Sequence, residues 1–485
     1  MKFIESSKLY NAFMHGAEYV MKYRTALNKI NVFPVADGDT GTNLQATMKS
    51  IISRAKPEKS VKKMMESIAD ASLGGARGNS GIIFSQYLNG LSMEISGEGS
   101  VSMEQFASAN LKSVDYAYGA VSDPVEGTML TVIKDWAQSL FDFHKKAAGF
   151  QELLSHGYDK LEKSLLKTKD QLSILRKAGV VDSGAKGFVL FIKGFIDVIV
   201  HGVQREMEIP VETENEEEPH IHIETKYRYC VEALIKGCHE TEVLRNELLK
   251  FGDSLIVAGN SRVARVHIHS DDPESVFDII GKHEEVLSKK VDDMALQSDI
   301  VENRKFNIAL ITDSIADLPR DFILENQITV VPLNILMNGL EYLDKITISN
   351  KRLLDYIDVG DEFPSSSQPD PKTIEANLSF LLDHYDSVIA ITVAAALSGT
   401  YNSFKTAAGN LNDRGKKISI IDSRQNSGSE GLLVMKCAEL IARGMSHERI
   451  VEEIDKRIPA SKIIVSVSNL ITMIKGGRLS ESAGK

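Results

Sequence analysis

Two aspartates separated by one glycine are the residues best suited to chemistry in this chain. Asp37 and Asp39 lie in a glycine-rich segment after Pro34, so both side chains can point at one centre. Mg²⁺ prefers oxygen ligands and usually takes one or two carboxylates, with water and substrate phosphates completing its shell. The segment therefore predicts a magnesium site. An Asx-rich turn that caps the next helix would explain the same residues without a ligand.

Short polar residues follow these aspartates directly. Thr42 and Asn43 lie at the start of an apolar helix that is predicted to run from Leu44 to Ile52. A helix N-terminus presents free N–H groups and favours an anion. One short segment could therefore hold both a metal ion and a phosphate.

Three further glycine-rich turns open predicted helices in the same part of the chain, near residues 74–81, 123–131 and 179–187. Glycine lets a backbone approach a phosphate closely, and hydroxyl and amide side chains add hydrogen-bond donors. Helix capping or close helix packing would explain each turn taken alone. The candidate ligands in these turns are Asn79, Ser80, Gly81, Thr128, Asp182 and Gly184.

The elements that must position these turns are helical. Apolar residues recur at helical spacing over 9–29, 61–73, 103–120, 130–147, 151–176 and 186–203, and no convincing alternating strand lies between them. Residues 1–205 are therefore predicted to form an all-helical domain. The acidic run from Glu206 to Glu218 is typical of a solvated linker.

At the four turns the chain resembles the nucleotide-binding (DhaL-type) domain of dihydroxyacetone kinases, and it resembles the fatty acid kinase family more closely. The segments that carry the resemblance are Asn31–Asn43, Gly75–Gly81, Pro124–Thr131 and Ala178–Gly184. The resemblance implies an antiparallel helical barrel that binds Mg-ATP at one end. Asp37 and Asp39 would hold Mg²⁺, with Asn31 as a weaker third candidate. The residues implied around the phosphates are Thr42, Asn43, Asn79, Ser80, Gly81 and Thr128, with Asp182 and Gly184 near the nucleoside.

Residues 206–300 are predicted to form a small α/β domain, with strands over 227–235, 254–258 and 263–269 and helices over 243–250 and 273–283. His267 and His269 are two apart on a strand, so both imidazoles project from one face. Cys230 lies on a strand that could pair nearby. Two histidines and a cysteine suit zinc, with Glu232 or water as the fourth ligand. Solvated histidines and a buried cysteine would explain the same spacing, but the segment also resembles the central domain of the fatty acid kinase family.

Residues 301–485 alternate strands and helices, which predicts a parallel sheet. Expected strands include 305–313, 328–336, 387–394, 417–421 and 462–466. Thr312 and Asp313 end the first of them, at the edge where open α/β sheets bind ligands. Hydroxyl clusters around Ser366 and Ser398 could hold a carboxylate or phosphate, although loop and cap chemistry would also account for them.

With the Gly-Gly-Arg motif that ends at Arg478, these clusters resemble the DegV family of fatty-acid-binding proteins. The resemblance implies that Ser366 and Ser398, together with Thr312 and Asp313, bind the fatty acid, and that Arg478 faces the kinase site. Ser366 stands where the family more often has threonine. DegV proteins continue well past this motif, so we expect the domain to be incomplete and the sequence to be part of a longer protein.

The composition narrows the class of protein. A formal net charge of -11 argues against nucleic-acid binding driven by bulk charge. No apolar run is long enough to span a bilayer, and the start lacks a signal-peptide core. Three cysteines are too few for a disulfide framework. A cytoplasmic protein is expected.

We therefore expect an ATP- and magnesium-dependent kinase that converts a protein-bound fatty acid to acyl phosphate, a reaction of phospholipid metabolism, with zinc as a candidate second metal. A homodimer is expected, and a separate DegV-family acyl carrier or an acyl-phosphate acyltransferase are candidate partners. A glycerone (dihydroxyacetone)-type kinase and a non-enzymatic lipid-binding protein with a nucleotide-sensing domain stay open as alternatives.

Overall fold

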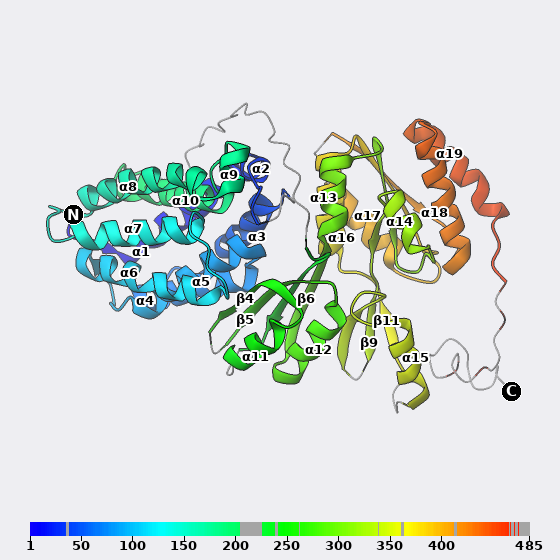
Figure 1. The fold of residues 1–485 in the computed structure, drawn as a ribbon, viewed down its shortest axis with the longest axis horizontal. Helices are drawn as coiled ribbons and strands as arrows, with labels where there is room; N and C mark the ends of the chain where they lie inside the picture. The colour runs from blue at the N-terminus through cyan, green and yellow to red at the C-terminus, as the bar shows by residue number, and fades with distance from the viewer. Residues whose placement is uncertain are drawn as a thin grey trace. The chain divides into compact units, whose positions relative to one another are not determined.

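The computed structural model describes residues 1–34, 38–203, 226–237, 241–260, 262–337, 339–359, 363–411 and 415–464, together with the single residues 466, 470 and 474. The chain divides into two compact units, Met1–Ala295 and Leu296–Lys485. In Figure 1 the first unit runs from blue to green and the second from green to red.

The first part of unit 1 is mainly helical, as the apolar spacing predicted. Its elements are β1 (Phe3–Glu5), α1 (Ser6–Lys22), α2 (Arg24–Lys29), α3 (Thr40–Arg54), α4 (Val61–Gly75), α5 (Gly78–Glu94), β2 (Ser100–Ser102), α6 (Met103–Ala120), α7 (Met129–Phe143), α8 (Phe150–Gln171), α9 (Ser173–Ala178) and α10 (Ser183–Ile199). The expectation of helices alone is wrong at one point, because β1 and β2 form an antiparallel pair with Ile4 opposite Val101. Each strand has three residues, too few to show an alternating pattern.

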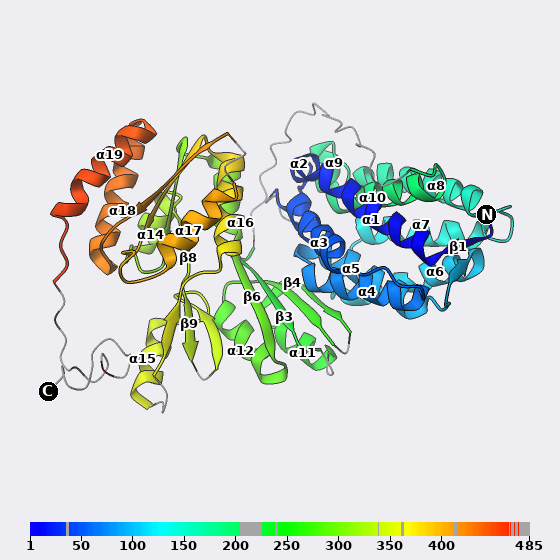
Figure 2. The same cartoon turned by 180° about the vertical axis from the view of Figure 1, so that it is seen from behind.

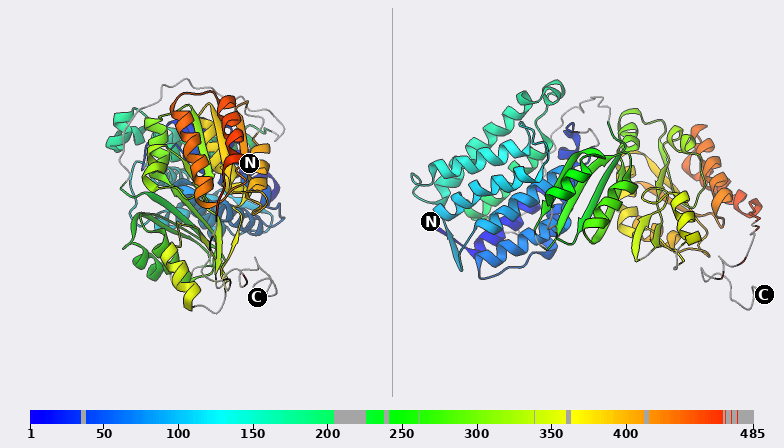
Figure 3. Two further views of the ribbon diagram at one scale, coloured as in Figure 1. Left: turned by 90° about the vertical axis from the view of Figure 1, so that its right-hand side faces the viewer. Right: turned by 60° about the horizontal axis from the view of Figure 1, so that its bottom comes forward.

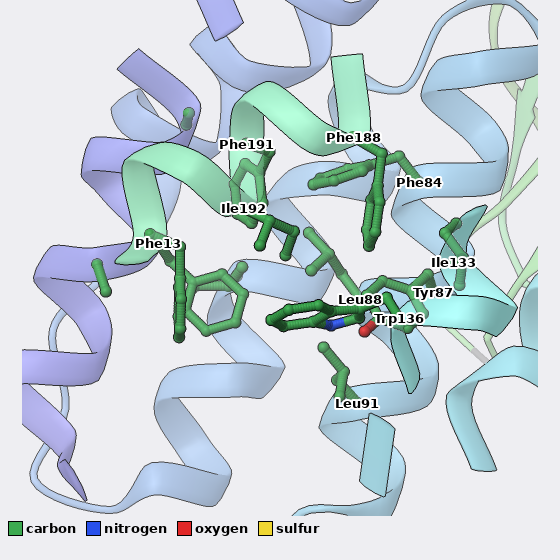
Figure 4. Close-up of a cluster of buried hydrophobic side chains, with 14 of the residues drawn as sticks. Phe13, Phe84, Tyr87, Leu88, Leu91, Ile133, Trp136, Phe188, Phe191 and Ile192 are labelled. Carbon is green, nitrogen blue, oxygen red and sulfur yellow. The ribbon is translucent and has the colours of Figure 1, made fainter. Parts of the chain in front are cut away.

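The helices contact one another in the order α1, α3, α4, α5, α6, α7, α8, α10 and back to α1. This closed ring is the arrangement that the resemblance implied. Its interior is aromatic (Figure 4): Phe84 and Phe13 both pack on Phe191 of α10, with ring centroids 4.8 and 5.9 Å apart, and Trp136 is fully buried. Gly16 lets α1 approach α10 closely, since a Cβ there would lie 2.7 Å from the Phe191 carbonyl oxygen.

The second part of unit 1 is a four-stranded antiparallel sheet with the strand order β4-β5-β3-β6. Its elements are β3 (Tyr229–Ile235), α11 (Thr241–Leu248), β4 (Gly252–Gly259), β5 (Ala264–Ser270), α12 (Pro273–His283) and β6 (Val286–Asp293). Three of these strands and both helices were predicted. β6 was missed because its Lys-Lys and Asp-Asp pairs hide any apolar alternation.

The two faces of this middle sheet have different partners, because alternate residues of a strand point to opposite sides. Val231, Val257 and Val266 share a core with α11 and α12. Ile256 and Ala258 instead join the core of the helical ring, and the right-hand view of Figure 3 shows the green strands beside the blue helices. The polar residues in register on this second face include Cys230, Glu232, Arg265, His267 and His269, with Lys290 and Asp292 of β6 opposite Glu232 and Cys230.

Unit 2 contains the predicted parallel sheet, with the strand order β13-β12-β7-β8. Figure 2 shows this unit from behind, with β8 labelled among its helices. A smaller antiparallel sheet has the order β10-β9-β11. The elements are α13 (Met294–Asn303, which begins in unit 1), β7 (Ile308–Asp313), α14 (Arg320–Glu325), β8 (Thr329–Val331), β9 (Asn334–Met337), β10 (Leu340–Leu343), α15 (Asn350–Val359), β11 (Ser365–Ser367), α16 (Pro371–His384), β12 (Ser387–Thr392), α17 (Thr400–Gly409), β13 (Lys417–Asp422), α18 (Ser427–Ala442), α19 (His447–Arg457) and the 3₁₀ turn Ile458–Ala460.

The central strands β7 and β12 are largely apolar because helices cover both faces of the sheet, whereas β13 also carries Lys417 and Ser419. Ala309 and Ile311 of β7 pack with α16 and α17, whereas Leu310 packs with α18 and α19. The strand expected over 462–466 is wrong for its described part, since residues 462–464 have no regular structure. Of the helices in the described ranges, none combines the length and apolarity that crossing a bilayer requires.

Asp182 ties together the starts of α7 and α10. Its Oδ1 accepts a hydrogen bond from the Ala185 N–H at 2.7 Å and so caps α10. The backbone of Met129, the first residue of α7, also hydrogen bonds to this carboxylate. Burial outweighs both hydrogen bonds and raises the pKa of Asp182 to about 6.

This raised pKa predicts a pH dependence of stability. The folded protein keeps the Asp182 proton up to about pH 6, whereas the unfolded chain releases it near pH ~4. The stabilisation is therefore full below the unfolded pKa and is lost as pH rises through about 6. Relative to Asp182→Asn, the wild type should lose up to about 3 kcal/mol of unfolding free energy between acid and neutral pH. Urea unfolding followed by fluorescence of Trp136, the single tryptophan, measures this. A difference that does not vary with pH would contradict the prediction.

Candidate functional site

The first glycine-rich turn delivers Asp39 to the start of α3. The Asp39 Oδ2 accepts a hydrogen bond from the Asn43 Nδ2 at 2.7 Å, across the first turn of the helix. The Thr40 hydroxyl donates to the Asn31 Oδ1. These contacts hold the side-chain oxygens of Asp39 and Thr40 in place at the N-terminus of α3. Asp37, the other predicted magnesium ligand, lies outside the described residues.

The second turn brings α5 against this helix start. Gly78 has φ +57, and a Cβ there would lie 2.4 Å from the Asn43 Nδ2, so only glycine fits. Asn79 and Ser80 follow in the first turn of α5. The Asn79 Oδ1 is buried and, among the described residues, has no hydrogen-bond partner. Such an atom is open to a ligand or water.

The other two turns use their polar groups for structure. The Thr128 hydroxyl caps α7 by accepting from the Leu130 N–H at 3.4 Å, and it donates to the Val125 carbonyl at 2.8 Å. Gly184 lies close to Ser80, since a Cβ on Gly184 would come within 2.6 Å of the Ser80 Oγ. The first, second and fourth turns therefore converge.

A small cavity, partly open to solvent, collects residues from both parts of unit 1. Its walls are Asn31, Phe33, Pro34, Asp39, Thr40, Asn43, Gly78, Asn79, Ser80, Cys230, His267 and His269. Four of the predicted magnesium and phosphate ligands thus share one cavity with the predicted zinc ligands: Asp39, Asn43, Asn79 and Ser80. Spacing along the chain could not show this proximity. The predicted ligands that do not line the cavity are Thr42, Gly81, Thr128, Asp182 and Gly184.

Cys230, His267 and His269 form a compact group of potential metal ligands. One ligand atom from each lies within 4.8 Å of the others. The Cys230 Sγ is 3.6 Å from the His267 Nδ1, and the two Nε2 atoms of the histidines are 3.2 Å apart. Burial raises the pKa of the Cys230 thiol and lowers that of His269 to about 3. Zinc binds neutral imidazoles and a thiolate, so the donor set fits zinc provided that Cys230 releases its proton when the metal binds.

Glu232 does not belong to this group of ligand atoms, which leaves water as the predicted fourth zinc ligand. Glu232 lies behind His267 instead, with its Oε1 3.5 Å from the His267 Nδ1. Burial opposes ionisation of Glu232, but Lys290 and His267 outweigh it and lower the pKa of the carboxyl group. A carboxylate behind a histidine ligand is the usual partner of a metal-bound imidazole.

In unit 2 the two hydroxyl clusters lie side by side. Ser366 is on β11, where strand rather than loop structure is found. Ser398 precedes α17, and its hydroxyl hydrogen bonds to that of Thr400 at 2.8 Å. A Cβ on Gly399 would come within 1.8 Å of the Gln368 Oε1, so the segment after β11 packs directly on the start of α17.

Thr312 and Asp313 are already engaged within the fold. The Thr312 hydroxyl donates to the Ile391 carbonyl at 2.8 Å. The Asp313 carboxylate accepts from the N–H groups of Val393 and Ile315. Both side chains are buried and fasten the ends of β7 and β12 together. Arg478, predicted to face the kinase site, lies outside the described residues.

Reasoning from sequence named Glu232 only as a possible metal ligand and did not identify Arg265, and both residues lie behind the cavity wall. The available signal was alternation, since Arg265, His267 and His269 are spaced two apart on one strand. Three polar residues on one face of an otherwise apolar strand indicate that this face meets other polar groups.

Comparison with known proteins divides the chain in three. Residues 34–197 match the DAK2 domain, residues 226–301 match the FakA-like middle domain of fatty acid kinase, and residues 307–484 match the DegV family. A DegV family protein from Thermus thermophilus, whose structure is described as showing fatty acid binding, is 29% identical, with a TM-score of 0.33, over 36% of this chain and 60% of that one.

Two relatives span more than one of these regions. An uncharacterised protein of Staphylococcus epidermidis is 33% identical over 63% of this chain and 60% of its own length. Protein YloV of Bacillus subtilis is 33% identical over 58% of this chain and 54% of its own length. The chain therefore spans little more than half the length of these relatives. Its own three regions match, in order, a DAK2 domain, a FakA-like middle domain and a DegV-family domain within one polypeptide.

Proposed function

We propose that the chain is an ATP-dependent kinase that phosphorylates the carboxylate of a fatty acid bound to its DegV-family domain, giving an acyl phosphate. The observation that carries the proposal is the cavity at which the N-termini of α3 and α5 meet beside Asp39. The three domain matches support it, since a kinase-type region and a region of the DegV family occur in one chain.

The nucleotide phosphates would lie against the first turns of α3 and α5, where backbone N–H groups favour anions. Asn43, Asn79 and Ser80 would add side-chain contacts. Asp39, with Asp37, would hold Mg²⁺, which offsets phosphate charge when bound. Most of the rate enhancement in phosphoryl transfer comes from such positioning and electrostatic stabilisation.

In the reaction, a carboxylate oxygen of the fatty acid attacks the γ-phosphorus of ATP. The bond from that phosphorus to the bridging oxygen breaks, and ADP leaves with the bonding electron pair. A fatty acid carboxylate is ionised at neutral pH, so no proton has to be removed and no general base is needed. Ser366 and Ser398 would donate hydrogen bonds to the carboxylate before transfer, and Arg478 would face the kinase site.

The Asp37→Asn/Asp39→Asn double variant tests the nucleotide site. Without these carboxylates, magnesium-dependent ATP binding should be lost, and acyl phosphate formation from oleate should fall by about a hundredfold or more. Isothermal titration calorimetry and transfer of labelled phosphate measure the two effects. Asp159→Asn is a matched control, because Asp159 is an exposed carboxylate on α8 away from the cavity.

Dihydroxyacetone serves as the competing acceptor in the same assay. Label on oleate in the wild type and the control, but not in the double variant, is the expected result. Label on dihydroxyacetone would identify a glycerone-type kinase instead, and label on neither acceptor would contradict the proposal.

We further propose that Cys230, His267 and His269, which line the cavity, would hold Zn²⁺, and that the ion would supply Lewis-acid chemistry when bound. The purified chain should contain about one equivalent of zinc by elemental analysis. His267→Ala/His269→Ala should remove it. His283→Ala in the same domain should not, since His283 pairs with Glu247 outside the cluster. Zinc absent from the wild type, or unchanged in the double variant, would rule the site out.

A further inference from the structure

The second glycine-rich turn of the helical ring is held from outside by the middle domain. The Gly78 N–H, at the first residue of α5, donates to the Glu232 Oε1 on β3 at 2.6 Å. Glu232 is 2% exposed, so the contact is shielded from water. The acceptor is 154 residues away along the chain. This hydrogen bond therefore does not belong to the local hydrogen bonding of the turn.

The other end of the same turn is held by a cation. The Arg265 guanidinium donates from Nε to the Leu73 carbonyl at 3.2 Å and from Nη2 to the Gly74 carbonyl at 2.8 Å. These carbonyls belong to the last turn of α4, where a helix leaves acceptors unsatisfied and favours positive charge. Arg265 is 8% exposed, so its charge is also largely out of water.

Both contacts come from neighbouring positions of one sheet. In the β3–β5 register Glu232 is opposite His267, and Arg265 is two residues before His267 on the same face. The residues between the two contacts are 75–77, and Asn79 and Ser80 of the cavity follow directly. An anion and a cation thus hold the two ends of the segment that leads into the candidate phosphate contacts.

We propose that Glu232 and Arg265 are positioning residues that hold residues 73–78 in the conformation required for nucleotide-phosphate binding, so that the middle domain completes the ATP site. This rests on the proposed function of the cavity. Neither side chain lines the cavity; both act through the backbone of the turn. A buried charge that loses its hydrogen-bond partner lowers the stability of the folded protein. The contacts of Glu232 and Arg265 therefore stabilise both the conformation of the turn and its packing on the sheet.

The test compares variants that keep or lose these contacts, in the full chain. Glu232→Ala and Arg265→Met should each raise the Kd for Mg-ATP, and the KM for ATP, by about tenfold with a smaller change in kcat. Glu232→Gln keeps an acceptor oxygen for the Gly78 N–H and should restore most of the affinity. Arg262→Met is the matched control: it removes an arginine between the same two domains, paired with Asp70 rather than with the turn, and should leave Kd unchanged.

The outcomes separate the positioning role from general damage and from failure of the proposed function. Thermal melting should show cooperative unfolding near the wild-type temperature for the control and for Glu232→Gln. If the wild type itself binds no Mg-ATP, the kinase proposal fails. If the wild type binds and both Glu232→Ala and Arg265→Met bind equally well, the positioning role is overturned.

Hydrogen exchange in the wild type provides a measurement that needs no variant to fold. A peptide spanning residues 73–81 should exchange slowly at the Gly78 amide, because that N–H is buried and bonded to Glu232. Exchange of this amide at the rate of an exposed loop would overturn the inference.

Discussion

A charge that leaves water has to find a partner, and this requirement organises the junction between the helical ring and the middle sheet. One face of the sheet is apolar and covered by its own helices. The other face carries Glu232 and Arg265, and both bond to the backbone of the turn between α4 and α5. These two charges therefore fix a loop of another domain as well as lying close to each other on the sheet.

The same face carries the cysteine and histidine group, so the turn and the candidate zinc ligands are parts of one buried polar layer. Glu232 contacts both: its Oε1 lies 2.6 Å from the Gly78 nitrogen and 3.5 Å from the His267 Nδ1. The cavity therefore has walls of two kinds, helix N-termini suited to phosphate and soft ligands suited to a transition metal. The position of the middle domain beside the helical ring brings these two sets of ligands into one cavity.

Unit 2 is built around a parallel sheet instead of an antiparallel one. Because helices cover both faces, the central strands β7 and β12 are largely apolar, and Thr312, Asp313 and Thr392 lie where these strands end. Some of these groups stabilise the fold itself, as with Asp313, which accepts two backbone N–H bonds. Ser366 and Ser398, which we expect to bind a carboxylate, lie in segments that pack on one another.

Sequence alone determined the features that depend on local periodicity and turn chemistry. Helical spacing predicted the helices of the ring, strand-like segments predicted β3 and β5, and the Asp39 turn indicated an anion-binding helix start. Tertiary structure decided which of these features meet. Short strands such as β1 and the charged strand β6 carry too little periodic signal to be found, and the role of Glu232 depends on a contact 154 residues away. Local patterns report how a segment folds, whereas a site built from two domains exists only after packing has brought their polar faces together.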